Sequence, residues 1–236
     1  MTLGAFAFLA AAAGTALAVQ APAPVNTSDK AAIEKIVRDY ILANPEIIPE
    51  AVEKLQAKRA AGRIEADRPA LETPYAGAWE GAAQGDVTLV EFFDYACGYC
   101  RTALADIAKL VAADKGLQIV YRELPILSDE STLAAKVSLL AAERGQYMAF
   151  HNAMYAAGRV TRETIIAAAG RAGIGKSDAE AAMASSKYDA EIEKNIALAQ
   201  KLQATGTPTF VVGNQSFNGA VGYDTLKEAV AAARKK

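Results

Sequence analysis

Apolar positions between residues 29 and 64 recur at the three- and four-residue spacing of amphipathic helices. The apolar face of the first predicted helix consists of Ile33, Ile36, Val37, Tyr40 and Ile41. The pair Asn44-Pro45 ends this helix, and Pro49 suits the first turn of a second one, which closes near Arg63 with basic side chains. Such a short pair must bury its apolar face, either against the rest of the chain or against another copy of the protein.

Beyond Pro69 the pattern becomes that of an α/β domain. Runs of β-branched and aromatic residues predict strands over 87–93 and 117–124, and an Ala-, Leu- and Ile-rich segment predicts a helix from about 98 to 113. This strand–helix–strand unit implies a parallel pair of strands joined by a right-handed crossover.

The C-terminal half is mostly helical. Residues 128–204 are Ala-rich and punctuated by glycines, which predicts an all-helical lobe inserted over about 128–186 and a long helix over 188–204. Within the lobe, Ser177 to Glu180 has the pattern of a capping box. Two short strands, 209–212 and 215–217, then flank a Gly-Asn turn, and residues 223–234 predict a closing helix.

The N-terminal segment has the pattern of an export signal. No charged side chain occurs before residue 19, and the apolar run ends in Ala16-Leu17-Ala18, the small-x-small pattern of a signal-peptidase site. Pro22 and Pro24 favour a linker over 19–28. We therefore predict a signal peptide over residues 1–18. An uncleaved membrane anchor and a buried helix are the alternatives.

Composition excludes several classes of function. The formal net charge is -2 and no basic stretch is interleaved with aromatics, so we expect no nucleic-acid partner. Hydrophobic residues make up 52% and charged residues 22%, which is typical of a globular chain. The only two cysteines, Cys97 and Cys100, share one four-residue motif, which suits them to react rather than to stabilise the fold.

The predicted chemistry centres on Cys97-Gly98-Tyr99-Cys100, at the junction of a strand and a helix. The first cysteine of such a motif lies at the helix N-terminus, where backbone N–H groups and the helix dipole favour a thiolate. Cys100 lies one turn deeper. We predict Cys97 as the attacking sulfur, Cys100 as the buried resolving sulfur, and Gly98 and Tyr99 as the rim that a substrate meets.

The same motif can also be half of a metal site. A zinc site needs two further soft or imidazole ligands, whereas the chain has one histidine, His151, which we expect on a helix face, and no third cysteine. A complete site needs a second subunit, or copper(I) with methionine. We therefore predict no metal ligand and no cofactor. A copper or zinc carrier that uses the dithiol stays an alternative of a different class.

Two further features favour a redox site. Glu91 is an acid in an otherwise apolar strand. Because burying a carboxylate is costly, it either points to solvent or serves the site, and we favour the acceptance of the Cys100 proton. Thr207-Pro208 directly precedes a strand, where a proline is tolerated. A cis peptide there would expose the Thr207 backbone for pairing with an extended substrate.

The segments VEFFDYACGYC, YRELPIL and TGTPTF resemble the DsbA-like branch of the thioredoxin superfamily over roughly residues 71–236. The resemblance implies an α/β, thioredoxin-like fold with an inserted all-helical lobe, here with an N-terminal helical extension over 29–64. It also implies that Cys97 is the nucleophile, Cys100 the resolving cysteine, Glu91 the buried acid and Pro208 a cis-proline that faces the dithiol.

Details of the motifs differ from a simple DsbA oxidase, which usually carries Pro-His between the cysteines and Val before the cis-proline. Gly98-Tyr99 and Thr207 resemble the choices of DsbC-type isomerases, and the extension over 29–64 is similar to that of ScsC-like proteins, some of which assemble through it. Without the histidine the thiolate is less stabilised, so the protein is less oxidising.

The resemblance therefore implies a periplasmic disulfide isomerase or reductase of client proteins that contain cysteines. It implies recycling by a membrane redox partner and a homo-oligomer formed through residues 29–64. A monomeric DsbA-like dithiol oxidase is the alternative within the same chemistry.

Overall fold

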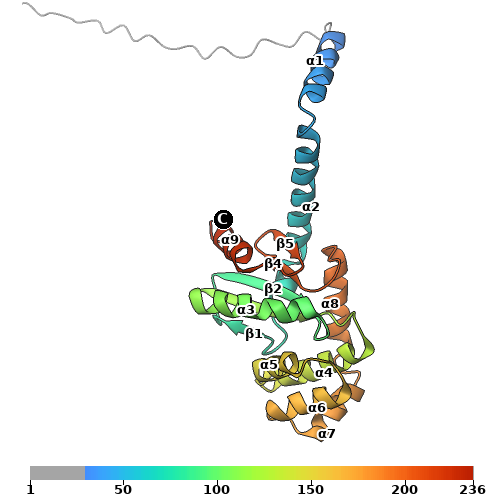
Figure 1. The fold of residues 1–236 in the computed structure, drawn as a ribbon, viewed down its shortest axis with the longest axis vertical. Helices are drawn as coiled ribbons and strands as arrows, with labels where there is room; N and C mark the ends of the chain where they lie inside the picture. The colour runs from blue at the N-terminus through green and yellow to red at the C-terminus, as the bar shows by residue number, and fades with distance from the viewer. Residues whose placement is uncertain (1–29, 236) are drawn as a thin grey trace, which may run out of the picture. The chain divides into compact units, whose positions relative to one another are not determined.

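The computed structural model describes residues 30–235, so the predicted signal peptide (1–18) and linker (19–28) lie outside the described residues. The chain divides into two compact units between Glu50 and Ala51. Helix α1 (Lys30–Ala43) belongs to the first unit, and α2 (Ile47–Glu72) begins in it and continues into the second (Figure 1). No helix within residues 30–235 has the length and apolarity needed to cross a membrane.

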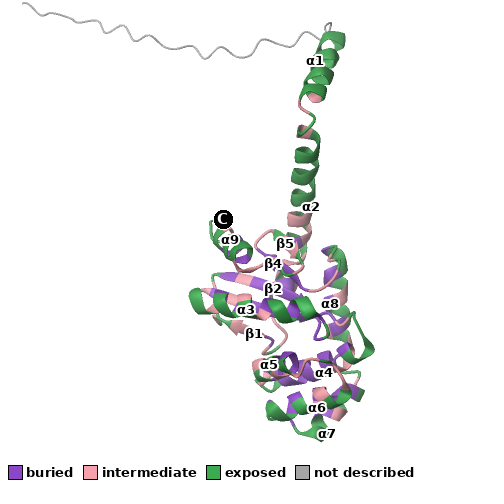
Figure 2. Ribbon diagram, in the orientation of Figure 1, coloured by how far each residue is buried: buried purple, intermediate pink, exposed green. Residues whose placement is uncertain are grey.

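The first unit confirms the predicted helix and leaves its apolar face open. No residue of α1 is buried, and Ile36 and Tyr40 are 67% and 59% exposed (Figure 2). In the described part of this unit, residues 30–50, the exposed large apolar side chains are Ile33, Ile36, Val37, Tyr40, Leu42 and Ile48. An amphipathic helix of this length depends on tertiary packing for most of its stability, so this face requires a partner surface.

Helix α2 is longer than predicted. We expected it to close near Arg63, whereas it runs to Glu72 with Pro69 inside it. The Arg68 guanidinium forms an ion pair with Glu72 at 2.7 Å, which spans the proline, and Leu71 is fully buried. Burial and ion pairing thus offset the backbone hydrogen bond that the proline removes.

The second unit contains a five-stranded sheet of order β1-β3-β2-β4-β5 in the described part of the chain. The strands are β1 (Trp79–Gly81), β2 (Val87–Phe93), β3 (Leu117–Glu123), β4 (Thr209–Val212) and β5 (Gln215–Asn218). β2 and β3 are parallel and joined by α3 (Gly98–Ala113), as predicted, whereas the other pairs are antiparallel. The edge strand β1 was not predicted because three residues are too few to show a period.

Both faces of the sheet are covered. Along β2, Leu89 and Phe93 pack with α3, with α9 (Tyr223–Ala233) and with the helical lobe. Val90 and Phe92 point the other way, toward α8 (Asp189–Lys201) and the buried end of α2. Because strand side chains alternate, Glu91 faces the same side as Leu89 and Phe93. The strand that leads to the dithiol is therefore buried on both sides.

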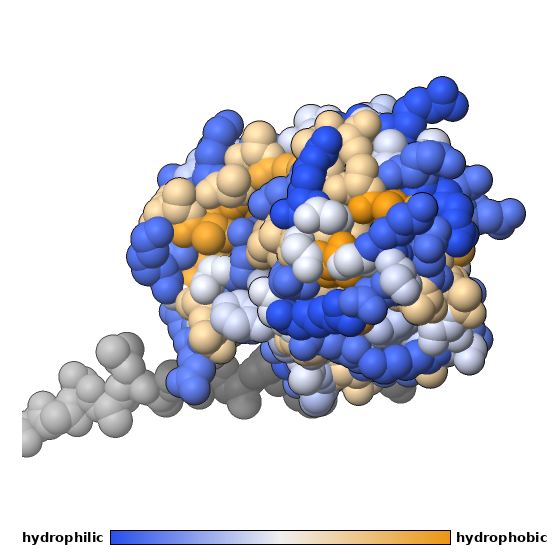
Figure 3. Space-filling view, turned by 90° about the horizontal axis from the view of Figure 1, so that it is seen from below, coloured by the Kyte–Doolittle hydropathy of each residue, from blue (hydrophilic) through white to orange (hydrophobic). Residues whose placement is uncertain are grey.

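The predicted helical lobe is confirmed between β3 and α8. Its helices are α4 (Asp129–Glu143), α5 (Tyr147–Ala157), α6 (Arg162–Arg171) and α7 (Lys176–Ala184). The capping box expected at Ser177 is wrong, because α7 begins at Lys176 after Gly175, with no side-chain cap, and a capping box instead joins Thr161 and Thr164 at α6. From below, hydrophilic side chains cover much of the molecule, with smaller apolar patches between them (Figure 3).

Candidate active site

The dithiol lies where β2 passes into α3. Cys97 has an extended backbone and is the N-cap of α3, so its Sγ accepts the backbone N–H of Cys100 at 3.3 Å. Both cysteines are free thiols and buried, with Cys97 5% and Cys100 1% exposed. Gly98 is exposed, and the Tyr99 side chain is 70% exposed on the rim. The deeper position of Cys100 agrees with the one-turn offset that the spacing predicts.

The loop before β4 meets the dithiol. The Thr207–Pro208 peptide is cis, and the Cys97 thiol donates a hydrogen bond to the Thr207 carbonyl at 3.1 Å, across 110 residues of sequence. The Pro208 carbonyl accepts the Gly219 N–H at 2.7 Å, which holds this loop against the end of β5. The fold thus brings the two predicted motifs into direct contact.

Glu91 lies on β2, six residues before Cys97, and is 1% exposed. Burial, and after it the charge on Cys97, raises the pKa of its carboxyl well above the ordinary value. Burial and the charge on Glu91 likewise raise the pKa of the Cys100 thiol. Because both groups hold a proton more tightly than in water, the carboxyl is suited to exchange a proton with the buried thiol.

Asp94, which the sequence analysis did not single out, joins two loops of the site. Its buried carboxylate accepts the backbone N–H groups of Ala96, Ile126 and Leu127 at 2.8, 2.9 and 2.9 Å. Its carbonyl accepts the Cys97 N–H at 3.0 Å. Ile126 and Leu127 are about half exposed, so the contact places two apolar side chains beside the dithiol turn. An aspartate directly after a buried strand is the available sequence signal for such a turn.

Glu123, at the end of β3, is a second buried acid that sequence reasoning missed. It pairs with Phe93 across the parallel ladder and is 2% exposed. Burial raises the pKa of its carboxyl well above the ordinary value, although a hydrogen bond with Ser138 opposes the shift. Its sequence signal is the one that Glu91 carries, an acid in an apolar strand, but no cysteine motif stands nearby in the chain.

His151, expected on a helix face, lies on the buried face of α5 and is fully buried. Its Nδ1 lies 3.2 Å from the Tyr95 hydroxyl, which also contacts the Ser138 hydroxyl at 2.8 Å. Burial lowers the pKa of His151 to about 3, so the ring is neutral at physiological pH. The aromatic rings packed around it are Phe93, Tyr95, Tyr121, Tyr147 and Tyr155.

The chemistry available at this site is thiol–disulfide exchange. It combines an attacking sulfur near the surface, a buried second sulfur, a carboxyl with a raised pKa and a backbone carbonyl at the rim. Within residues 30–235, no group of three or more His, Cys, Asp and Glu side chains is arranged to hold a metal ion.

Comparison with known proteins places this site in a family. Residues 88–231, more than half of the chain, match the family model described as a DSBA-like thioredoxin domain. The chain belongs to the DsbA-like thioredoxin family. Residues 29–61 match a second model, the N-terminal domain of the copper resistance protein ScsC. The resemblance and the fold class expected from the sequence are thus confirmed.

Solved structures agree with the family. A thioredoxin-like oxidoreductase from Silicibacter pomeroyi is 40% identical, with a TM-score of 0.66 over 70% of this chain and 96% of that chain. ScsC of Proteus mirabilis in a transitional conformation is 25% identical, with a TM-score of 0.68 over 89% and 99%. A periplasmic thioredoxin-like protein from Salmonella enterica serovar Typhimurium is 28% identical, with a TM-score of 0.63 over 72% and 96%.

Among curated proteins, about two thirds of this chain is similar to one part of longer chains. The Na(+)/H(+) antiporter NhaA 3 of Salinispora tropica is 26% identical over 156 residues, and NhaA 1 of Salinispora arenicola is 24% identical over 156 residues. The chain spans about a quarter of the length of these relatives.

Proposed function

We propose that this DsbA-like protein is exported to the periplasm, where it isomerises or reduces wrong disulfides in client proteins. The observation that carries the proposal is the contact of Cys97 with both the Thr207 carbonyl and the N-terminus of α3. Cys100 is buried, and the charge on Glu91 contributes to the raised pKa of its thiol. Export is supported by the N-terminal pattern and by the periplasmic relative from Salmonella enterica.

In the proposed reaction the Cys97 thiolate attacks one sulfur of a client disulfide. A Cys97–client S–S bond forms as the client S–S bond breaks, and the other client sulfur leaves as a thiolate. For isomerisation, a second client thiolate attacks the client sulfur of that bond and releases Cys97, with no net change in oxidation. For reduction, Glu91 accepts the Cys100 proton and the Cys100 thiolate attacks Cys97. This step frees a reduced client and leaves a Cys97–Cys100 disulfide for a membrane partner to reduce.

The residues between the cysteines favour shuffling over oxidation. Neither Gly98 nor Tyr99 carries a positive charge, and the single histidine, His151, is buried in α5. A less stabilised thiolate makes a weaker oxidant. The exposed Tyr99 ring supplies an aromatic surface beside Cys97 for an unfolded client.

We also propose that α1 joins copies of the protein. Its exposed apolar face is the kind of surface that a second identical helix covers, and the matched ScsC N-terminal model spans it. The variant Ile36→Gln/Tyr40→Gln should lower the mass in solution to that of one chain, whereas Arg38→Gln on the same helix should leave it unchanged. A wild-type mass of one chain would overturn this proposal.

Recovery of scrambled ribonuclease tests the direction of the chemistry. The wild type should restore ribonuclease activity, and Cys97→Ser should not. Cys100→Ser should accumulate client adducts at Cys97, visible as mixed disulfides on non-reducing gels. Oxidation of reduced ribonuclease without any recovery of the scrambled form would favour the monomeric oxidase.

A copper or zinc carrier is the alternative of a different class. It is favoured by the match of residues 29–61 to the N-terminal domain of a copper resistance protein. Stoichiometric metal retained through dialysis, lost in Cys97→Ser and accompanied by no insulin reductase activity, would favour it. Reductase activity without retained metal would favour the exchange enzyme.

A further inference from the structure

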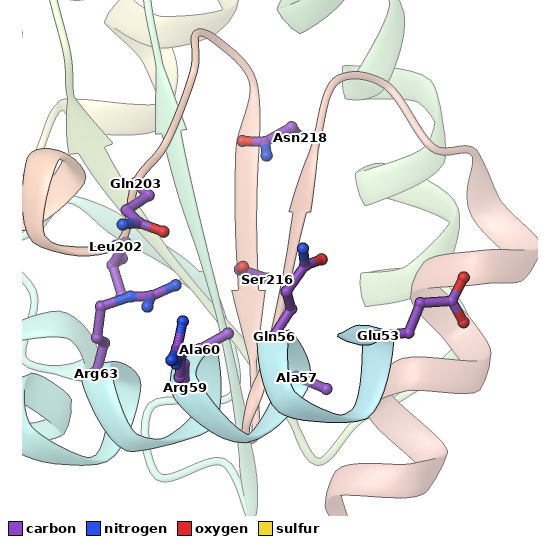
Figure 4. Close-up of a pocket in the computed structure, with 10 residues that line it drawn as sticks. All are labelled: Glu53, Gln56, Ala57, Arg59, Ala60, Arg63, Leu202, Gln203, Ser216 and Asn218. Atoms are coloured by element: carbon purple, nitrogen blue, oxygen red, sulfur yellow. The ribbon is translucent and has the colours of Figure 1, made fainter. Parts of the chain in front are cut away.

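A polar pocket lies outside the dithiol site, within the second unit. Its volume is about 660 Å³, a size typical of pockets that hold small ligands or side chains. Figure 4 shows Arg59 and Arg63 of α2 on one wall, with Gln203, just after α8, and Ser216 of β5 across from them. We call this the arginine pocket.

Arg59 is exposed and Arg63 is half-buried, and the two lie close together without an acidic partner in the described part of the chain. They are four residues apart on one helix, so their like charges lie on the same face and repel. Neither has an ion-pair or hydrogen-bond partner among the residues that the structure describes, and the Nε of Arg63 is buried without one. Arg68 on the same helix pairs with both Glu65 and Glu72. A bound anion would offset the repulsion between Arg59 and Arg63.

The other residues that line the arginine pocket place no anionic group beside the two arginines. Glu53 also lines the pocket, but it precedes Arg63 by ten residues, about 15 Å along the helix axis, and Figure 4 shows its carboxylate at the far end. Gln56, Gln203 and Ser216 add neutral hydrogen-bond donors. Guanidinium groups with amide and hydroxyl donors around them match the oxygens of a carboxylate or a phosphate.

The wall of this pocket continues into the loop that meets the dithiol. Gln203 precedes Thr207 by four residues, which places them no more than about 14 Å apart. Asn218, on the pocket wall, accepts hydrogen bonds from the Thr209 hydroxyl at 2.9 Å and the Thr205 N–H at 3.5 Å. At that upper limit, an extended polypeptide that pairs with Thr207 covers the distance with about four residues.

We propose that the arginine pocket binds a carboxylate of the client polypeptide, from an acidic residue about four positions away from the cysteine that Cys97 attacks. The inference rests on the proposed function, because it needs a polypeptide client at Thr207. The pocket requires an oxyanion as its ligand, and a free phosphate ion is an oxyanion as well as a client carboxylate. The pocket thus adds a specificity element for acidic client segments to the exchange reaction.

Matched peptide disulfides test the proposal. Each peptide carries one cysteine, as a mixed disulfide with glutathione, and either Glu or Gln four positions away on either side. For the wild type, kcat/KM for the better Glu peptide should exceed that for its Gln counterpart about tenfold at low ionic strength, and salt should reduce the ratio. Arg63→Gln and Arg59→Gln should bring the ratio near one, and Arg63→Lys should give an intermediate value.

Lys58→Gln is the matched control, because Lys58 lies on α2 and does not line the pocket. It should keep the wild-type ratio and the wild-type rate of glutathione disulfide reduction. A wild-type ratio near one, or an unchanged ratio in Arg63→Gln, would overturn the proposal. So would calorimetric binding of inorganic phosphate that is lost in Arg63→Gln while the peptide ratio is one. A preserved peptide ratio without recovery of scrambled ribonuclease would instead remove the isomerase function and leave the pocket's role.

Discussion

Two buried carboxyls occupy the same face of the sheet in different surroundings. Glu91 of β2 pairs with Tyr121 of β3, and Glu123 of β3 pairs with Phe93 of β2. The charge on Cys97 acts on Glu91, whereas Glu123 is hydrogen-bonded to Ser138 under the helical lobe. Burial raises the pKa of both carboxyls. We therefore expect both acids to affect stability and only Glu91 to affect the reaction.

The largest expected effect concerns the resolving step. Glu91→Gln keeps the shape of the side chain and removes the proton acceptor, so the attack of Cys100 on the mixed disulfide should slow by roughly 100-fold. Formation of the mixed disulfide by Cys97 should change little. Quenched-flow measurement of the mixed disulfide separates the two steps. Glu123→Gln is the matched control, and an equal slowing in both variants would contradict the comparison.

The next largest effect concerns acid stability in the Glu123 region. His151 has a folded-state pKa of about 3 against an ordinary value of 6.5, so the folded protein holds its ring neutral. This contribution to stability is present above pH 6.5 and is lost as the pH falls toward 3. At pH 5 the free energy of unfolding should be about 2 kcal/mol below its value at pH 7, because the unfolded His151 ring takes up a proton. Denaturant unfolding of His151→Gln should show a flatter profile between pH 5 and 7, and an unchanged profile would contradict the assignment.

The two acids make the same prediction for the pH dependence of stability, although only Glu91 is expected to affect the reaction. A carboxyl whose folded-state pKa lies above its ordinary 4.5 contributes most to stability below pH 4.5, and the contribution declines as the pH rises toward the folded value. In that interval, Glu91→Gln and Glu123→Gln should each gain about 1.4 kcal/mol of unfolding free energy over the wild type per pH unit. Urea unfolding from pH 4 to 8 measures this. A gain in only one variant would show that the other carboxyl is not held protonated.

The contrast between the acids also shows what the sequence can predict. Glu91 was identified because it stands six residues before a C-x-x-C motif, so a local pattern suggested its chemistry. Glu123 is also an acid in a buried strand, but no cysteine motif stands near it in the chain, and Ser138 comes from a lobe that only the tertiary fold brings close. Asp94 was missed for the same reason, since two of its three donors lie more than 30 residues away.

The helices and strands show the same difference between features set by local sequence and features set by tertiary contacts. The strands β2, β3 and β4 and the helix α3 have strong local patterns, and their positions agree with the prediction. The extension of α2 through Pro69 depends on the burial of Leu71 and on an Arg68 ion pair, neither of which a proline-based boundary includes. The exposed face of α1 shows the remaining limit, because its period predicts a helix and does not identify the surface that covers it.

The smallest expected effect concerns Tyr95, which lies between the dithiol with Glu91 and the surroundings of Glu123. The Tyr95 hydroxyl contacts the Ser138 hydroxyl and His151 Nδ1 on the Glu123 side, only two residues before Cys97 in sequence. Tyr95→Phe removes both contacts and should lower the free energy of unfolding by about 1 kcal/mol. The rate of the resolving step should stay within about twofold of the wild type, because the hydroxyl points toward the lobe and Glu91 is unchanged.

Because Tyr155 donates to the Asp94 carbonyl at 3.2 Å, Tyr155→Phe is the matched hydroxyl deletion beside the dithiol turn. A resolving step that slows in Tyr95→Phe and not in Tyr155→Phe would mean that the buried cluster under the lobe takes part in the exchange reaction.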